Sequence, residues 1–570
     1  MNPRGTLVAA LTALVLLLSA CASIPSTGKV REGRVDVEQG ADVGQVAVGP
    51  ASDAEPDAIV RGFLLAAQAG PTSSTPFSVA KEYLTQTAGT SWRPYARVVV
   101  LDGSPQLTVE PVDAEASTAT VRASGRILAS LDERGVYAEA PAPMPHEVTF
   151  ELTRTGGQWR ISSLDDGLMV PSQVFTSAYH YTRLYFPTPD LQSWVPDVRW
   201  FPQQTWRTNA VREVLAGPPE WLGGAVTSVL PEGTSLAIDA VAVGAAGTVE
   251  VTLTEQVADA TSQELALFRA QLQATLSDSG GHSYRVDLLD ATGPLAGSEG
   301  VSVPRAPRTL GPALAVRDGR LWRVEGRSLT AAEDLDVDLS GLDPTALATG
   351  PQTDPVVVRD GTARIVRVSG GRQTVLLEGP DLVAPSVDRY RAVWSGVPGG
   401  ALQVVLPSGS RYPVTAPWLE DRTVTSLRVS PDGARLAVVT SGTSGTSVQV
   451  AGIVRDAQGV PTSLTDPVTV GASVHGVTQA VWQDEAVLGL LGDDDDGGRT
   501  LFLSGVGGLA GVGGAHSREV AGLTGPASVT ASVGLATTLA LDDDGVLYQR
   551  QSAALWPVLA EHVDLVAYPG

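Results

Sequence analysis

The sequence predicts a multidomain protein that combines α+β domains with an all-β C-terminal domain. Apolar residues recur at helical spacing from Ile59 to Ala67 and are followed by segments of alternating apolar and polar residues. Strand and helix patterns then alternate through residues 172–300. From about residue 309 helical patterns cease, and short apolar runs recur around Asp-Gly turns to the end of the chain. Three different folds in succession are therefore expected.

The N-terminal segment is typical of a secretory signal. Arg4 precedes an apolar run, residues 7–18, which is too short to span a bilayer. The run leads into a motif made of Leu18, Ser19, Ala20 and Cys21. This motif resembles a bacterial lipobox, in which the cysteine receives a diacylglycerol, the peptide is cut before it, and the new amine is usually acylated; palmitate is the acyl group we expect. We predict a signal peptide at 1–20 and stable two-signal lipid anchoring at Cys21; a plain signal peptide with an incidental cysteine is the alternative.

Composition narrows the possible functions. The chain carries 39 Lys and Arg against 62 Asp and Glu, a formal net charge of −23. Nucleic-acid binding needs a clustered basic surface, so we expect no nucleic-acid partner. Cys21 is the only cysteine, which excludes intramolecular disulfides and cysteine metal clusters. Residues 21–55 are rich in Gly, Ser and Asp and are predicted to form a linker from the lipidated cysteine, with a coil-like reach of about 30–35 Å.

The first predicted domain spans residues 56–171. A helix starts near Pro56, and a second short helix carries Val79 and Tyr83. Strands with a period of two are predicted at residues 96–101, 106–112, 117–129, 146–153 and 159–163. A helix pair followed by a curved antiparallel sheet resembles the cone-shaped NTF2-like fold. Such cones often enclose a pocket, but we expect the aromatic residues to fill the cone as core: Phe63, Tyr83, Trp92 and Trp159.

The second predicted domain spans residues 172–300. Its expected elements are a strand at 182–186, a polar excursion through Trp194 and Trp200, a helix at 208–216, a strand pair at 236–243 and 248–253, a helix at 265–276 and a strand at 284–289. The segment resembles the GerMN domain of sporulation and germination lipoproteins in the order of four features: Arg183-Leu-Tyr-Phe, Val214-Leu-Ala-Gly-Pro, Leu230-Pro-Glu-Gly-Thr and a helix with Gln271 and Thr275. It departs at the last hairpin, where Asp290-Ala291-Thr292-Gly293 replaces a short Asp-Gly turn. No catalytic residues are established for that domain type, so none are implied here.

The third predicted domain spans residues 301–570. Its first two Asp-Gly turns, Asp318-Gly319 and Asp360-Gly361, lie 42 residues apart, close to the repeat of a four-stranded propeller blade. This predicts a β-propeller of about six blades, with seven possible and a pair of β-sandwiches as the competing architecture. We expect Trp394 and Trp482 to be blade core, and Trp418 is the tryptophan whose exposure is worth testing.

No catalytic or metal-binding constellation is evident. Asp493–Asp496 and Asp542–Asp544 lack the spaced ligands of a calcium loop and are expected to be solvated turns. The six histidines show no H-x-x-x-H pair, which leaves zinc unsupported. Ser444 lacks the second glycine of a nucleophile elbow, and Gly505–Gly514 lacks the lysine of a phosphate-binding loop. The sequence therefore predicts no enzyme activity, no catalytic residues, no metal and no cofactor.

The lipobox and the order of the three domains are together similar, over essentially the whole chain, to the actinobacterial LpqB lipoprotein family. The resemblance implies a lipoprotein on the outer face of the cytoplasmic membrane. It also implies association with the extracellular sensor domain of the MtrB histidine kinase and modulation of the MtrAB two-component system in cell-wall homeostasis and division. A peptidoglycan-binding or other glycan-binding envelope protein stays open as the alternative.

Overall fold

The computed structural model describes residues 47–570, apart from 112, 114, 245–246, 278–283, 296–300, 305–310, 444, 510–516 and 535–536. The predicted signal peptide, the lipobox with Cys21 and most of the predicted linker lie outside the described residues, as does Ser444. The described residues, from Ala47 onward, belong to one compact unit. It contains α+β domains followed by an all-β domain, which confirms the predicted fold class.

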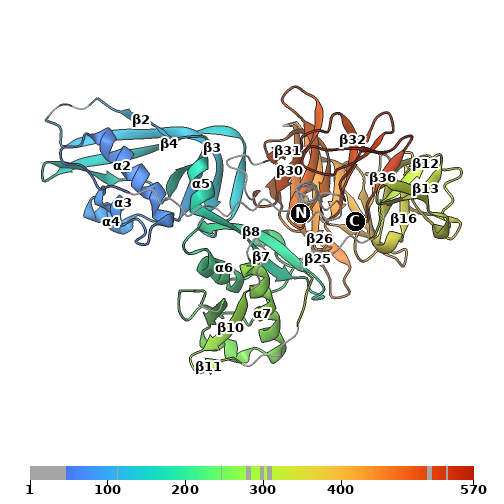
Figure 1. Ribbon diagram of the computed structural model, residues 1–570, viewed down its shortest axis with the longest axis horizontal. Helices are drawn as coiled ribbons and strands as arrows, with labels where there is room; N and C mark the ends of the chain where they lie inside the picture. The colour runs from blue at the N-terminus through green and yellow to red at the C-terminus, as the bar shows by residue number, and fades with distance from the viewer. Residues whose placement is uncertain are drawn as a thin grey trace, which may run out of the picture. The chain divides into compact units, whose positions relative to one another are not determined.

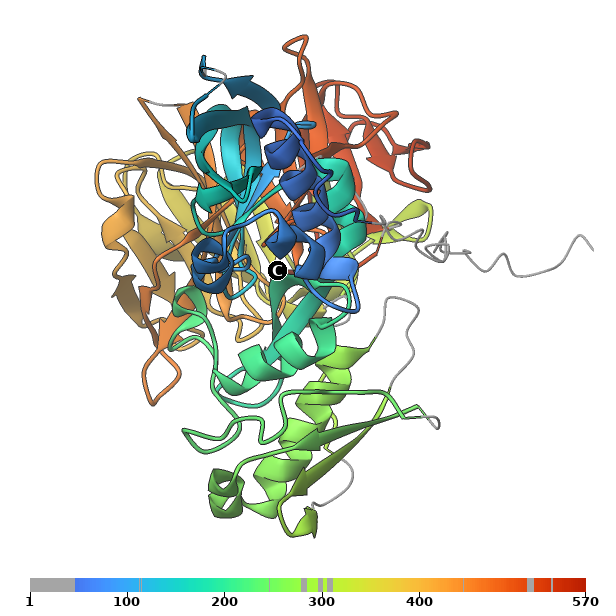
Figure 2. The same ribbon diagram turned by 90° about the vertical axis from the view of Figure 1, so that its left-hand side faces the viewer.

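The first domain is a curved six-stranded sheet with helices on one face. Its helices are α2 (Pro56–Ala69), η1 (Gly70–Thr72), α3 (Ser78–Glu82), α4 (Gln86–Ser91) and α5 (Ser172–Ala178). Its strands are β1 (Arg97–Leu101), β2 (Gln106–Val109), β3 (Thr118–Asp132), β4 (Tyr137–Thr155), β5 (Gln158–Ser163) and β6 (Leu168–Pro171). The sheet order is β5-β4-β3-β1-β6, with β2 paired to β3. Figure 1 and Figure 2 show α2 lying across the sheet.

Helix α2 follows from its apolar stripe. Pro56 lies in its first turn, where a missing N–H costs nothing, and Ile59, Val60 and Phe63 are buried against the sheet. The strands confirm the predicted alternation, although β4 begins nine residues before the predicted start at 146. Strand β6 and helices α4 and α5 were not expected, and the predicted start of the second domain at 172 coincides with the first residue of α5.

The second domain begins with a long hairpin of β7 (Tyr179–Pro187) and β8 (Trp194–Pro202). It continues with α6 (Trp206–Leu215), η2 (Glu220–Leu222), β9 (Thr248–Thr252), η3 (Glu255–Asp259), α7 (Ser262–Leu276), β10 (Arg285–Asp290) and β11 (Gly293–Pro294). Strands β9 and β10 pair in parallel, and β11 pairs with β10. A capping box between Thr261 and Glu264 starts α7, because each side chain satisfies a backbone N–H of the other.

Two expectations for this domain were wrong. The predicted polar excursion through Trp194 and Trp200 is strand β8, and all nine of its residues are buried. The predicted strand at 236–243 forms only two isolated bridges. The departure at residues 290–293 also has a local explanation, because the Asp290 carboxylate accepts the N–H groups of Thr292 (2.7 Å) and Gly293 (3.1 Å) and closes the turn.

The first half of the all-β domain consists of three four-stranded sheets. The first contains β12 (Leu314–Arg317), β13 (Arg320–Glu325), β14 (Ser328–Ala331) and the last strand of the chain, β36 (Leu565–Ala567). The second contains β15 (Pro344–Thr349), β16 (Val356–Asp360), β17 (Arg364–Ser369) and β18 (Arg372–Glu378). The third contains β19 (Ser386–Val387), β20 (Val393–Gly396), β21 (Leu402–Val405) and β22 (Arg411–Val414). Short helical turns η4 (Glu333–Leu335), η5 (Pro351–Thr353) and η6 (Pro417–Leu419) join strands.

Three further sheets complete the domain. The fourth contains β23 (Thr423–Val429), β24 (Arg435–Gly442), β25 (Gly445–Arg455), β26 (Pro461–Leu464) and β27 (Val468–Val470). The fifth contains β28 (His475–Trp482), β29 (Val487–Asp493), β30 (Arg499–Gly505) and β31 (Ser517–Glu519). The sixth contains β32 (Pro526–Thr530), β33 (Leu539–Asp542), β34 (Leu547–Gln549) and β35 (Val558–Ala560).

These successive sheets are the blades of a propeller. The part of the chain that the structure describes supplies six of them, which confirms the prediction of about six blades over a pair of sandwiches. Strand β36 returns to pair with β12, Leu314 opposite Ala567, so the last strand closes the ring on the first blade. Because β36 follows the sixth blade in the chain, this pairing links the sixth blade to the first.

Candidate functional site

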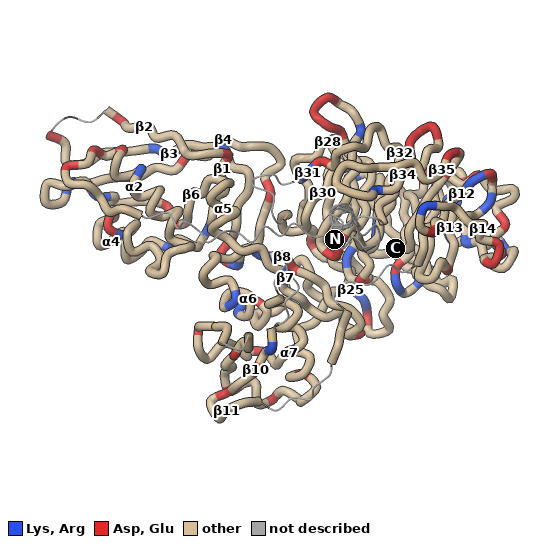
Figure 3. The backbone as a smooth tube through the Cα atoms, viewed as in Figure 1, with Lys and Arg blue, Asp and Glu red and all other residues tan. Residues whose placement is uncertain are grey.

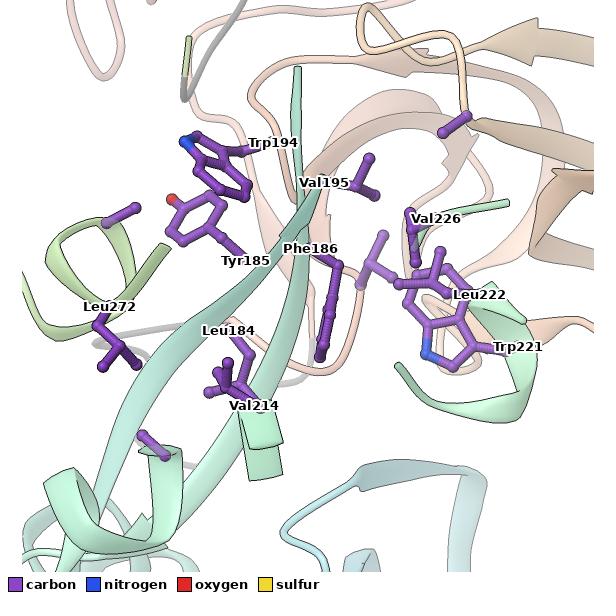
Figure 4. Close-up of a cluster of buried hydrophobic side chains, with 14 of the residues drawn as sticks. Leu184, Tyr185, Phe186, Trp194, Val195, Val214, Trp221, Leu222, Val226 and Leu272 are labelled. Carbon is purple, nitrogen blue, oxygen red and sulfur yellow. The ribbon is translucent and has the colours of Figure 1, made fainter. Parts of the chain in front are cut away.

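The β7–β8 hairpin packs directly against the propeller. One cluster of buried apolar residues combines Phe186 and Val195 of the hairpin with Val439, Trp482 and Leu490 of the fourth and fifth blades. Figure 4 shows Phe186 and Val195 on the hairpin, with side chains from the η2 segment beside them. Because this apolar surface is withdrawn from water, its burial stabilises the contact between the two domains.

A polar group around the buried Glu485 lies at the same contact. Arg183 of β7 donates from Nη1 to Glu485 Oε1 (2.7 Å) and from Nη2 to Asp484 Oδ2 (3.1 Å). Tyr185 Oη donates to the same Glu485 oxygen. The Glu485 side chain is only 6% exposed, so these donors replace the water that burial removes. We call Arg183, Tyr185, Asp484 and Glu485 the hairpin joint.

The electrostatics of the hairpin joint favour a charged Arg183. Burial alone would lower the pKa of Arg183, but Tyr181 and the carboxylates of Asp484 and Glu485 raise it above its ordinary value. Burial has the opposite effect on Tyr181 and raises its pKa; the centre of its ring lies 5.9 Å from the guanidinium carbon of Arg183. Arg183 therefore stays ionised at every physiological pH.

A second buried arginine supports Glu485 from inside the propeller. Arg435 is fully buried, pairs with Asp432 and donates from Nη2 to the Glu485 carbonyl oxygen (2.6 Å). Its guanidinium lies 4.6 Å from the Trp482 ring centroid, a distance suited to a cation–π interaction. The loop at 483–486, which presents Glu485 to the hairpin, is thus fixed from both sides.

The tip of the hairpin makes a third polar contact. Asp190 accepts two bonds from Arg389 Nη2, at 2.8 and 2.7 Å, and one from Tyr390 Oη (2.9 Å). Partial burial would raise the pKa of Asp190, but hydrogen bonds from Thr188 and Arg389 lower it to about 2. Asp190 is therefore a carboxylate throughout the physiological range.

Further polar contacts connect the first domain and the hairpin to the rest of the chain. Trp200 Nε1 of the hairpin donates to Gly507 O of the propeller (3.0 Å), and the Glu139 carboxylate of β4 accepts from Ser473 Oγ (2.8 Å). Arg134 pairs with Glu213 of α6 at 2.7 Å. The hairpin also reaches the first domain, because Trp200 N–H donates to Gly135 O (2.9 Å) and Arg199 Nη1 donates to Arg134 O (2.8 Å). The β7–β8 hairpin therefore touches every domain, which sequence reasoning missed because it placed β8 in a loop.

Helix α2 and the sheet of the first domain line an open cavity of about 260 Å³. The predicted core aromatics Phe63, Tyr83, Trp92 and Trp159 are all buried, which confirms their role as core. The cavity lies beside them, with an apolar floor that includes Phe63, Phe150 and Met169 and a polar mouth that includes Arg97, His146 and Asp165. Burial, followed by the Arg97 charge, lowers the pKa of His146. Such a cavity can hold a small apolar group with a polar end.

The predicted propeller residues fall into two groups. Trp394 and Trp482 are buried, as expected of blade core. Trp418 is half-buried, packs against the apolar cluster that contains Trp394 and donates to Thr465 O (3.0 Å), so it is not a free surface aromatic.

The acidic runs of the propeller lie in turns. Asp494 and Asp542 accept N–H groups of their own hairpin turns, and acidic residues lie at several propeller loops in Figure 3.

Two negative findings apply to the described part of the chain alone. Within it, no group of three or more His, Cys, Asp or Glu side chains is placed to hold a metal ion. Among the helices assigned there, none combines the length and the apolar character that a membrane crossing requires.

Comparison with known families matches three successive segments of this chain. A model described as the N-terminal domain of Lipoprotein LpqB matches residues 49–176, a sporulation and spore germination model matches residues 183–289, and a model of the Lipoprotein LpqB β-propeller domain matches residues 319–567. The three matches follow the three structural domains in order.

Whole-chain relatives agree with these matches. Lipoprotein LpqB of Thermobifida fusca is 26% identical and covers 98% of this chain and 97% of its own. Lipoprotein LpqB of Bifidobacterium longum is also 26% identical, with 83% of each chain covered. Among solved structures, TolB from Acinetobacter baumannii is 11% identical with a TM-score of 0.34, covering 46% of this chain and 68% of its own. The chain belongs to the LpqB lipoprotein family.

Proposed function

We propose that this chain is a lipid-anchored accessory protein of the cell envelope that binds the extracellular sensor domain of an MtrB-type histidine kinase. Binding on the extracytoplasmic side of the membrane would modulate the MtrAB two-component system, which governs cell-wall homeostasis and division. The partner comes from the family resemblance. The contacts between the domains support a role in binding.

The observation that carries this proposal is the hairpin joint. Arg183, Tyr185 and Glu485 connect the second domain to the propeller through buried charged hydrogen bonds, which are stronger than neutral ones. Such contacts hold surfaces of different domains in fixed register. A partner can then contact several domains at once, and binding does not have to fix their relative positions. This reduces the conformational entropy that is lost on binding.

Anchoring at Cys21 explains how a weak contact could suffice. A tethered protein meets a membrane-embedded partner at a high effective concentration, because the encounter is confined near the membrane. If it binds one signalling state of the kinase more tightly than the other, binding shifts the population toward that state. A Cys21→Ala chain, which lacks the acceptor for the lipid, should therefore regulate the pathway far less well than the anchored chain.

Site-specific crosslinking in cells tests the proposed partner. Exposed apolar residues offer one probe position in each domain: Leu65, Ile238 and Tyr412. Each is replaced in the full-length chain by a photo-crosslinking residue, and covalent products are identified by mass spectrometry. We expect the kinase from at least one position. Equal labelling of unrelated membrane proteins at all three positions would contradict the proposal, and sedimentation of the chain with purified cell wall would favour the glycan-binding alternative.

A further inference from the structure

A groove on the propeller gathers arginine side chains from two blades. In the second blade, β17 and β18 pair with Arg367 opposite Thr374 and Ser369 opposite Arg372. Side chains two residues apart on a strand share a face, so these four groups project from one side of the sheet. Each arginine thus lies opposite a hydroxyl group, and the two arginines are diagonal neighbours.

The third blade supplies the other wall. Arg391, from the turn between β19 and β20, lines the groove together with Pro407. Arg391 pairs with Asp354 across the groove at 3.1 Å. The space between these walls is about 300 Å³ and its lining is largely polar. We call this feature the interblade groove.

The charges of the interblade groove are not balanced. Among the described residues, neither Arg367 nor Arg372 has an ion pair or a side-chain hydrogen bond, and Asp354 already pairs with Arg391. Asp336 flanks the groove, where its carbonyl accepts the N–H of Gly371 (2.8 Å). Like charges on neighbouring strands repel each other. Two unpaired guanidinium groups on one face are therefore unusual in a chain with a net charge of −23.

We propose that the interblade groove binds a phosphate group, either free in solution or carried by a phospholipid headgroup. A guanidinium presents parallel N–H donors that match two oxygens of a phosphate, and charge-assisted bonds of this type are strong. The hydroxyls of Ser369 and Thr374 can donate to further oxygens of the same anion. Bound phosphate would neutralise Arg367 and Arg372 and remove their mutual repulsion.

Distance explains why the acidic chain need not repel this anion. At physiological ionic strength charges are screened over about 8 Å, so an anion in the groove interacts more strongly with the arginines that line it than with most of the acidic surface. The anion therefore responds to the local excess of arginine in the groove more than to the overall charge.

The test is a calorimetric titration of the full-length chain with two soluble probes at physiological salt. Inorganic phosphate represents the free anion, and dihexanoyl phosphatidylglycerol below its micelle concentration represents a phospholipid headgroup. The variants are Arg367→Gln and Arg372→Gln. Arg320→Gln is the matched control, because Arg320 is an exposed propeller arginine outside the groove. All three positions are accessible to solvent, so melting temperatures should show that each variant folds.

We expect saturable binding of at least one probe, weakened about tenfold or more by each groove variant and unchanged in the control. Binding of phosphate alone would identify the free anion as ligand, and binding of the lipid alone would identify the headgroup. Arg372→Lys should recover part of the affinity, since it restores the charge without the planar fork. The proposal is overturned if neither probe binds, or if the groove variants bind as tightly as Arg320→Gln.

Discussion

The hairpin joint makes a quantitative prediction about the coupling of Arg183 and Glu485. Their N–O distance is 2.7 Å, and the Glu485 side chain is 6% exposed against 28% for Arg183. At an effective dielectric constant of about 20, charge centres about 4 Å apart attract by about 4 kcal/mol. Partial exposure of Arg183 screens this attraction, so we expect a coupling free energy of about 2–3 kcal/mol.

The measurement is a double-mutant cycle of Arg183→Gln, Glu485→Gln and the double variant. Stability is followed by denaturant unfolding, with hydrogen exchange of β7 to localise the change, because a multidomain chain need not unfold in one step. The control cycle uses Arg212 and Asp239, an ion pair whose side chains are 47% and 73% exposed and whose coupling should stay below about 0.5 kcal/mol. Equal coupling in the two cycles would refute the reasoning.

Three further predictions concern single side chains. Burial, followed by the Arg207 charge, lowers the pKa of His180 to about 4; since the unfolded side chain titrates near 6.5, stability should fall by about 3 kcal/mol as pH drops from 6.5 to 4. His180→Phe, which can keep the ring stack on Trp206, should flatten that pH dependence in denaturant unfolding, and an unchanged slope would assign it to other groups. Ala567→Glu should destabilise the first blade by at least about 3 kcal/mol, because it buries a charge in the strand that closes the ring, whereas Leu555→Glu at an exposed site should change little; equal melting temperatures would argue against closure by β36. Arg97→Gln should raise the pKa of His146 toward its ordinary value in an NMR titration, and no shift would mean that burial alone lowers it.

Local patterns were sufficient to predict most of the fold. The stripe from Ile59 to Ala67 predicted α2, and the spacing of the Asp-Gly turns predicted the blade count. Both signals lie within a few turns or one repeat of the chain. Patterns of this length predict structure well, because the spacing of residues along a helix or strand determines which side chains share a face.

Strand β8 shows where local patterns fail. Pro196, Asp197 and Arg199 interrupt any apolar alternation, so the segment looks like a polar loop. In the fold Arg199 Nε donates to Asp197 (2.7 Å) and Nη1 donates to Arg134 O (2.8 Å), so the buried guanidinium has both an anionic partner and a carbonyl acceptor. The second of these partners is 65 residues away, and its position depends on the tertiary structure.

The candidate sites also differ in whether their residues are close together or far apart in the sequence. Lipidation at Cys21 remains a prediction from local sequence alone. In the hairpin joint, Arg183 contacts Glu485, which lies 302 residues later in the sequence. In the interblade groove, Arg391 of the third blade lies beside residues of the β17–β18 hairpin of the second blade. The side of the groove formed by the second blade could have been predicted from the sequence, because Gly370-Gly371 forms a tight turn that sets Ser369 opposite Arg372.

Direct titration with the purified extracellular domain of the MtrB-type kinase tests the central claim most directly. The anchored chain, reconstituted in nanodiscs, is titrated with that domain, and binding is followed by fluorescence anisotropy. Our account predicts saturable binding that weakens when Arg183→Gln and Glu485→Gln are combined, because the domains then lose their fixed register. Absence of saturable binding, with the chain folded and anchored, would contradict the account.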